Sequence, residues 1–444
     1  MDLTSILPAL GGTAWTLIFF IIALSVIVAI HEYGHYIVGR WCGIHSEVFS
    51  IGFGRVLFSR IDKRGTKWQI AALPFGGYVK FLGDANAASV GGTDAVANVN
   101  PRNTMLGAPL WARAATVAAG PIFNFILAIF IFAGYMMWEG ERTEPLTYGG
   151  SPELPPGFVS DLQIGDQVIA IDGLLVDEPD NVLRNSDELT VKREMEWTIL
   201  RDGQEMVVTG PHPYLTLVSI VTPRSAADDA GVRLGDFVTH VNGEEIFALA
   251  DIIRIKEETN NAPMTLVIYR DGETFESVMT PTRFDRPMPD GTFRTEYLIG
   301  LGSDLYFDPE VKPIGVFDAL WSGTQELWWR ITTSLNGLWH MVTGAISSCN
   351  LSGPVGIAQT SGSMAQQGAD NFVFFIGILS VAVGLLNLFP IPVLDGGHLV
   401  FHAYEAVTRR KPSDAALRVL MSLGVAIIGS IMVFAILNDL VLCP

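Results

Sequence analysis

Two histidines and a glutamate stand at the spacing His-x-x-x-His inside a long apolar stretch, as His31-Glu32-Tyr-Gly-His35. Residues four apart lie one above the other on the same face of an α-helix, so the two imidazoles can bind one metal ion. Glu32, next to His31, can then reach a water at that metal and act as a general base. The spacing therefore predicts a zinc site with catalytic chemistry.

The apolar stretch around these residues, 16–39, is long enough to cross a bilayer. Ionisable groups inside a membrane span are costly, and they usually face a polar cavity where they serve function. The alternative is a pair of buried, hydrogen-bonded histidines beside an incidental glutamate, and the membrane setting disfavours it.

A second polar motif follows a later apolar stretch and reads Asn387-Leu-Phe-Pro390-Ile-Pro392-Val-Leu-Asp395-Gly-Gly-His398. The two prolines break the helix at membrane depth, and broken backbone there is tolerated mainly where it lines protein or a water-filled cavity. Asp395 would supply the third ligand of a His₂-carboxylate zinc site, which leaves the fourth position for water. His398 is a competing candidate, and the residues alone do not exclude it.

Four membrane spans are predicted, at about 15–39, 113–138, 372–389 and 417–440. Basic residues gather in 40–80 and at 409–411, whereas 139–370 is acidic, in a chain of net charge −18. Positively charged loops stay on the cytoplasmic side, so both termini and the acidic region are expected on the opposite side. The metal motif then lies near the cytoplasmic end of the first span. The acidic balance disfavours nucleic acid as a partner.

Two further features accompany the spans. Strand-like segments at 55–60 and 66–73 flank a turn and predict a β-hairpin, whose unpaired edge could pair with an extended substrate. A small surface hairpin packed on the membrane domain fits the residues equally well. The segment 83–109 is expected to be a mobile loop, and a tryptophan-bearing amphipathic helix within 313–348 is expected to lie at the membrane surface.

The acidic region contains an internal repeat. A Gly-Asp pair, an apolar strand and a turn ending in Gly occur from Gly165 to Gly173 and again from Gly235 to Gly243, an offset of 235 − 165 = 70 residues. Two copies of a small β-rich module are therefore predicted. The pattern resembles PDZ domains, which bind peptides by strand addition. The segment Pro223–Val232, which precedes the second copy, has no clean counterpart before the first copy. The alternative role for the two modules is a spacer or size filter.

His31-Glu-Tyr-Gly-His35 together with the motif from Asn387 to Asp395 resembles the site-2 protease family of intramembrane zinc metalloproteases, and the similarity covers essentially the whole chain. The resemblance implies that His31, His35 and Asp395 bind Zn²⁺ and that Glu32 is the catalytic acid and base. It also implies that three residues position an unwound substrate helix, namely Asn387, Pro390 and Pro392.

The resemblance further implies a multi-pass protein of the bacterial inner membrane that cleaves single-span membrane proteins of the anti-sigma factor type, with remnant signal peptides as a second substrate class. The PDZ-like pair would be a periplasmic filter that admits substrates only after a first cut outside the membrane. Two other classes of protein remain as alternatives: a membrane zinc transporter, and a PDZ-based signalling scaffold without proteolysis.

The predicted fold is a polytopic α-helical membrane protein with four transmembrane helices, a membrane-associated β-hairpin and two periplasmic PDZ-like modules. The expected boundaries are 1–40 for the first transmembrane helix, 41–111 for the cytoplasmic hairpin and loop, 112–138 for the second transmembrane helix, 139–210 and 211–305 for the two modules, 306–369 for the amphipathic helix and connector, 370–398 for the third transmembrane segment, and 399–444 for the last loop and helix.

Overall fold

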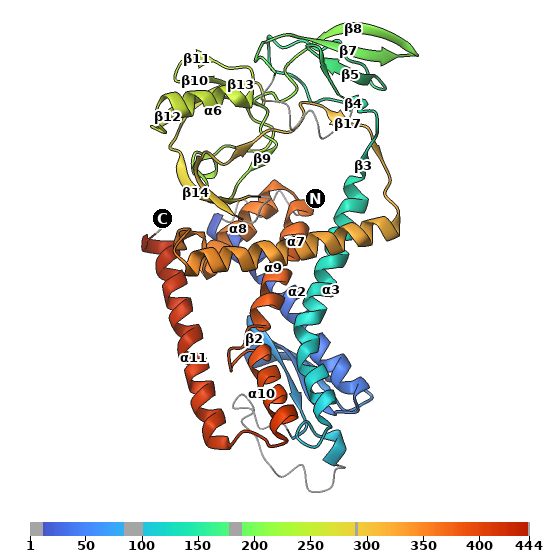
Figure 1. Cartoon of the computed structure of the whole chain (residues 1–444), viewed down its shortest axis with the longest axis vertical. Helices are drawn as coiled ribbons and strands as arrows, with labels where there is room; N and C mark the ends of the chain where they lie inside the picture. The colour runs from blue at the N-terminus through green and yellow to red at the C-terminus, as the bar shows by residue number, and fades with distance from the viewer. Residues whose placement is uncertain (1–11, 84–100, 177–188, 289–291, 443–444) are drawn as a thin grey trace. The chain divides into compact units, whose positions relative to one another are not determined.

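The computed structural model describes residues 12–83, 101–176, 189–288 and 292–442. The chain divides into two compact units, one formed by residues 1–134 and 320–444 and the other by residues 135–319 (Figure 1). Most of the loop expected at 83–109 lies outside the described residues.

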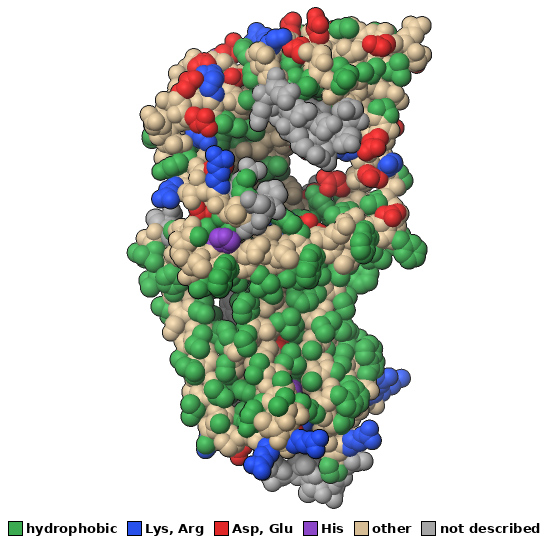
Figure 2. Space-filling view, in the orientation of Figure 1, with side chains coloured by type: hydrophobic (Ala, Val, Ile, Leu, Met, Phe, Trp, Pro, Cys, Tyr) green, Lys and Arg blue, Asp and Glu red, His purple; other side chains and the backbone are tan. Residues whose placement is uncertain are grey.

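Four helices among the described residues are long and apolar enough to cross a membrane, as predicted. They are α2 (Gly12–Trp41), α3 (Leu110–Glu139), α9 (Ala369–Asn387) and α11 (Asp414–Leu437), the last continued by a π-helical turn, η6 (Asn438–Leu442). Hydrophobic side chains cover this helical unit in Figure 2, and Lys and Arg side chains gather at its lower end. This distribution is the one expected for a protein in a lipid bilayer.

Three further helices complete the first unit. The amphipathic stretch forms α7 (Val316–Val342). This helix packs closely on α3, because an added Cβ at Gly323 would lie 3.1 Å from the backbone nitrogen of Ala133. The sequence did not predict α8 (Pro354–Gln367), which packs along α2 and accepts a hydrogen bond from Trp15 Nε1 at the Gly362 carbonyl. The short α10 (Asp395–Thr408) begins after the prolines, and short 3₁₀ turns stand at Pro101–Asn103 (η3) and Ser348–Asn350 (η5).

The predicted hairpin is longer and more folded than its sequence indicates. Its strands are β1 (Ser46–Ile61) and β2 (Lys67–Phe81). Phe49 pairs with both Trp68 and Val79, so the first half of β1 lies between the two halves of β2. Among the described residues, the half of β2 from Gly77 to Phe81 pairs with β1 on one side only, which leaves a strand edge.

The second unit contains two four-stranded sheets of the same design. One has the order β6-β5-β7-β8 and the other β11-β10-β12-β13. The first sheet consists of β5 (Gln167–Ile171), β6 (Leu174–Leu175), β7 (Met195–Arg201) and β8 (Gln204–Gly210). The second consists of β10 (Phe237–Val241), β11 (Glu244–Glu245), β12 (Met264–Arg270) and β13 (Glu273–Met279).

The repeat extends to single side chains. Asp166 and Asp236, both 1% exposed, form paired hydrogen bonds with Arg201 and Arg270 respectively. Each aspartate also caps the preceding turn by accepting a backbone N–H. The two sheets are therefore structural repeats at the predicted offset.

The remaining elements of this unit are small. They are β3 (Glu141–Arg142), β4 (Tyr148–Gly150), β9 (Ile220–Val221), α5 (Ala226–Asp229), α6 (Leu249–Glu258), β14 (Thr282–Pro287), β15 (Phe293–Leu298), β16 (Leu301–Gly302), β17 (Asp308–Pro309) and β18 (Val311–Lys312).

Candidate metal centre

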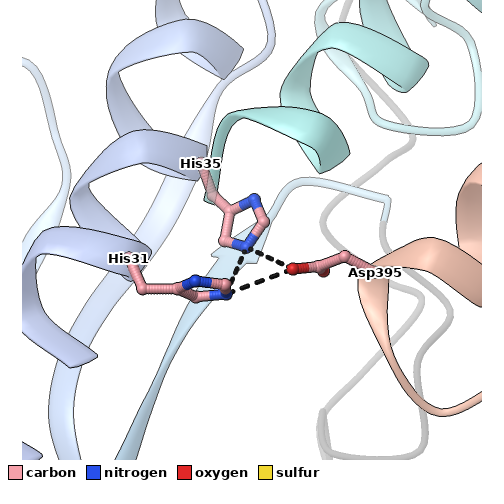
Figure 3. Close-up of side chains that lie close together, drawn as sticks. All are labelled: His31, His35 and Asp395. Carbon is pink, nitrogen blue, oxygen red and sulfur yellow. Dashed lines mark hydrogen bonds and ion pairs between the residues drawn. The ribbon is translucent and has the colours of Figure 1, made fainter. Parts of the chain in front are cut away.

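The two histidines project from α2 toward the same point. His35 follows His31 by four residues and therefore lies on the same face of α2. The Nε2 atoms of the two side chains lie 3.2 Å apart. His31 is buried and His35 nearly so. The pair therefore presents two imidazole nitrogens to one position, as the spacing predicts (Figure 3).

Asp395 meets this pair from α10. Its Oδ2 atom lies 3.1 Å from Nε2 of His31 and 3.4 Å from Nε2 of His35. The same oxygen is buried and is among the described side-chain atoms that have no hydrogen-bond partner. Two imidazole nitrogens and a carboxylate oxygen form the one cluster with metal-binding geometry found among the described residues. Its donor set fits a zinc ion with an open fourth position. His398, the competing candidate, lines the adjacent cavity and is not part of this cluster.

The other ring nitrogens of both histidines are held by α3. His35 Nδ1 lies 2.8 Å from the Thr116 carbonyl oxygen, to which it donates, and this contact leaves Nε2 free of its proton. His31 Nδ1 lies 3.2 Å from the Asn124 side-chain amide, whose Oδ1 atom is buried without a partner. If His31 held a metal through its other ring nitrogen, its proton would reside on Nδ1, and a half-turn of the amide would let Oδ1 accept it.

A glycine makes room for the histidines against α3. An added Cβ at Gly120 would lie 2.5 Å from Cε1 of His35 and 2.8 Å from Cε1 of His31. Both distances are far below ordinary van der Waals contact. α3 therefore approaches the imidazoles at a point where only glycine fits.

Glu32 lies beside the cluster on a cavity of about 1120 Å³. Gly77 of β2 lets the strand edge come close, because an added Cβ there would lie 3.0 Å from Cγ of Glu32. The cavity is lined by polar and apolar side chains of α2, β2, α3, α9, α10 and α11, among them Tyr78, Arg113, Asn387, His402, Glu405 and Arg418. It gives water and an extended chain room next to the candidate metal centre.

The residues proposed for substrate positioning lie where α9 gives way to α10. Asn387 is the last residue of α9 and lines the cavity. Pro390 and Pro392 stand in the turn that follows, and the backbone next to Pro392 packs against Gly397 at the start of α10. The turn directs Asp395 toward α2.

Several contributors escaped the sequence interpretation. Thr116 acts through its backbone carbonyl, a group that every residue has, so its role cannot be inferred from the residue type. Arg113 of α3 and Glu405 of α10 form a buried ion pair across 292 residues. In the sequence, Arg113 and Glu405 are charged residues near predicted membrane helices, and charged residues are common at membrane borders. Nothing in the sequence indicates that these two residues pair.

Comparisons with known proteins identify the family. The model of peptidase family M50 matches residues 19–431. A protein of Agrobacterium fabrum that is named as a predicted zinc metalloprotease is 35% identical to this chain over 99% of both chains. The regulator of sigma E protease of Salmonella typhi is 31% identical over 96% of this chain and 98% of its own length. A relative of that name in Salmonella typhimurium matches to the same extent. The chain thus belongs to peptidase family M50, the site-2 protease family, and is a zinc metalloprotease with membrane-spanning helices.

Proposed function

We propose that the protein is an intramembrane endopeptidase that cleaves the transmembrane segment of single-span membrane proteins after a first cut outside the membrane. The observation that carries the proposal is the convergence of His31, His35 and Asp395 within a helical unit whose helices match a membrane span in length and composition. A protease centre in that setting acts on peptide bonds that also reside in the bilayer.

His31, His35 and Asp395 are proposed to hold the zinc ion. When bound, zinc lowers the pKa of water and polarises a peptide carbonyl. Glu32 takes the proton of the attacking water and passes it to the leaving amine. Thr116 and Asn124 fix the rotation and the tautomer of the two imidazoles.

Substrate handling is assigned to the strand edge and the helix break. A transmembrane helix hides its carbonyls in its own hydrogen bonds, so a scissile segment must unwind and find new partners. The edge of β2 from Gly77 to Phe81 lines the cavity and offers backbone groups to an extended chain. Asn387, which lines the cavity, adds a side-chain amide, and Pro390 and Pro392 are proposed to help it position the unwound substrate.

The two repeated sheets are proposed to be PDZ-like modules that restrict access to substrates whose outer domain has been removed. Their matched strand order, turns and Asp–Arg pairs support a duplicated module. We place the modules and both termini outside the cytoplasm, in the periplasm of a bacterium whose inner membrane the helices cross. The basic segments 40–80 and 409–411 are placed in the cytoplasm. Substrates of the anti-sigma factor type and remnant signal peptides both fit this arrangement.

The test is cleavage of a single-span model substrate, trimmed of its outer domain, by the full chain and by Glu32→Gln, with bound zinc measured in both. We expect cleavage to be lost and zinc to be retained. Glu326→Gln, which breaks an ion pair with Arg330 inside α7, is the matched control and should cleave as the wild type does. Equal cleavage by Glu32→Gln would refute the assigned role. Transport of zinc across vesicles without cleavage by any variant would favour the transporter.

A further inference from the structure

α10 carries the proposed third ligand but has little packing of its own. Of its described residues, Gly396 and Gly397 are the buried ones, and both lie at its first turn beside Asp395. An added Cβ at either glycine would collide with backbone carbonyls of Leu388, Phe389 or Ile391, so this end sits tightly on the preceding turn. That contact fixes the position of the first turn of α10. The direction of the helix axis must then depend on contacts made by later residues of α10.

The far end of α10 is joined to α3 by one ion pair. Nη1 of Arg113 donates to Oε2 of Glu405 at 3.0 Å, and Nη2 donates to Oε1 at 2.7 Å. The two side chains are 9% and 17% exposed. Arg113 also donates through Nε to the carbonyl of Ala108, at 3.2 Å. A bidentate pair constrains orientation as well as distance, so it can set the direction of a helix.

The Glu405 carboxylate remains ionised in this position. Its hydrogen bonds from the Arg113 guanidinium hold its pKa below the ordinary range despite burial. The pair is therefore a charged contact at neutral pH, in a wall of the same cavity that reaches the metal centre.

Arg113 belongs to a row on α3 that serves the whole site. Arg113, Thr116, Gly120 and Asn124 are spaced by three, four and four residues, which places them along one face of a helix. Thr116 holds His35, Asn124 holds His31, and Gly120 lets both rings approach. Arg113 holds the helix that carries Asp395. One face of α3 thus contacts the support of every proposed ligand.

We propose that Arg113 and Glu405 are positioning residues: their ion pair fixes α10 against α3 and so holds Asp395 within zinc-binding distance of His31 and His35. The inference rests on the proposed zinc site. It assigns to the pair no contact with the substrate and no proton transfer.

The experiment compares zinc affinity in the full-length protein, by competition with a chromophoric chelator, without any substrate. The test variants are Glu405→Gln, Glu405→Asp and Arg113→Lys, with the double variant Arg113→Lys/Glu405→Gln. Glu326→Gln breaks an ion pair with Arg330 inside α7 and is the matched control. His35→Gln tests the proposed site itself.

We expect about a tenfold or greater loss of zinc affinity in Glu405→Gln and in Arg113→Lys, since outer-shell partners typically contribute 10–100-fold. The double variant should lose no more than the worse single variant, because both changes break one contact. Cobalt substituted for zinc should show weaker visible absorption as the tetrahedral set loosens. Glu326→Gln should match the wild type in affinity and spectrum.

Wild-type zinc affinity with a wild-type cobalt spectrum in these variants would overturn the inference. A raised KM at unchanged zinc affinity would overturn it too, in favour of direct substrate contact. Retention of zinc by His35→Gln would instead refute the proposed site. If Glu405→Gln does not yield folded protein, Arg113→Lys and Glu405→Asp decide the question, because both retain the two buried charges.

Discussion

Gly120→Ala is the substitution for which the structure gives the sharpest expectation. The new Cβ would lie 2.5 Å from His35 Cε1 and 2.8 Å from His31 Cε1, and closer still to His35 Nε2. Ordinary contact begins near 3.4 Å. Either both rings withdraw by about 1 Å or α3 moves away by a similar distance, and displacements of that size cost roughly 100-fold in activity where geometry is demanding.

The energetic expectation follows from the same contact. Overpacking of a closely packed site costs about 1–3 kcal/mol, whereas replacing Gly by Ala inside a helix gains about 1 kcal/mol of helix propensity. The fold is therefore expected to survive while the metal centre does not. We predict that zinc affinity and cleavage of a single-span substrate fall by about 100-fold or more.

The assay is chelator competition for zinc in parallel with cleavage. Gly134→Ala is a matched control on the same helix, because an added Cβ at Gly134 meets nothing within 4 Å. It should bind zinc and cleave as the wild type does. Wild-type zinc affinity and cleavage in Gly120→Ala would refute the claim that α3 and the imidazoles meet at a point of no free space.

Two further predictions follow from single contacts. Asn124→Ala removes the partner of His31 Nδ1 and should lower zinc affinity by about 10–100-fold, as judged by chelator competition, whereas Ser380→Ala, which removes the hydroxyl bonded to the Asn124 carbonyl, should change it far less. Asp166→Asn leaves Arg201 without its charged partner and should lower the protection of β5 and β7 against amide hydrogen exchange, with β10 and β12 unchanged. Burial raises the pKa of Asp166, but the Arg201 guanidinium and the Gln163 N–H outweigh it and leave the pKa below the ordinary range. Because the folded pKa lies below the unfolded one, this contact stabilises at pH above about 4 and its contribution is lost as pH falls further, so the protection of β5 and β7, taken relative to the intrinsic exchange rate at each pH, should fall more on acidification in the wild type than in Asp166→Asn.

The sequence predicted the features that depend on local periodicity. The four apolar helices, the shared face of His31 and His35, and the duplicated sheets all follow from spacing along one segment. The hairpin was predicted too short, because Phe49 pairs with two segments of β2 and such a return of the strand has no local pattern. α8 was missed because its sequence is only weakly amphipathic and rich in small residues, which suit close packing on α2.

The residues alone left the choice between Asp395 and His398 open, although the family resemblance favoured Asp395. Both residues belong to the first turn of α10, and either side chain is a chemically suitable zinc ligand. Asp395 reaches the histidines through the direction of α10, and we propose that this direction depends on the turn before the helix and on an ion pair to a residue 292 positions away. No pattern in a single sequence connects Arg113 with Glu405.

α3, which carries no proposed ligand, contacts the supports of all three proposed ligands. α2 contributes two proposed ligands and α10 the third, yet the contacts that orient the imidazoles and the far end of α10 come from one face of α3. A helix of 30 residues fixes the separation of its own side chains, so it can hold two neighbouring helices at a set distance. Substitutions beside the imidazoles on this face should therefore change metal affinity without removing a ligand, and substitutions at exposed positions of the same helix should not. Gly120, packed against both imidazoles, and Gly134, where an added Cβ meets nothing within 4 Å, make that contrast measurable with the smallest possible change in side chain.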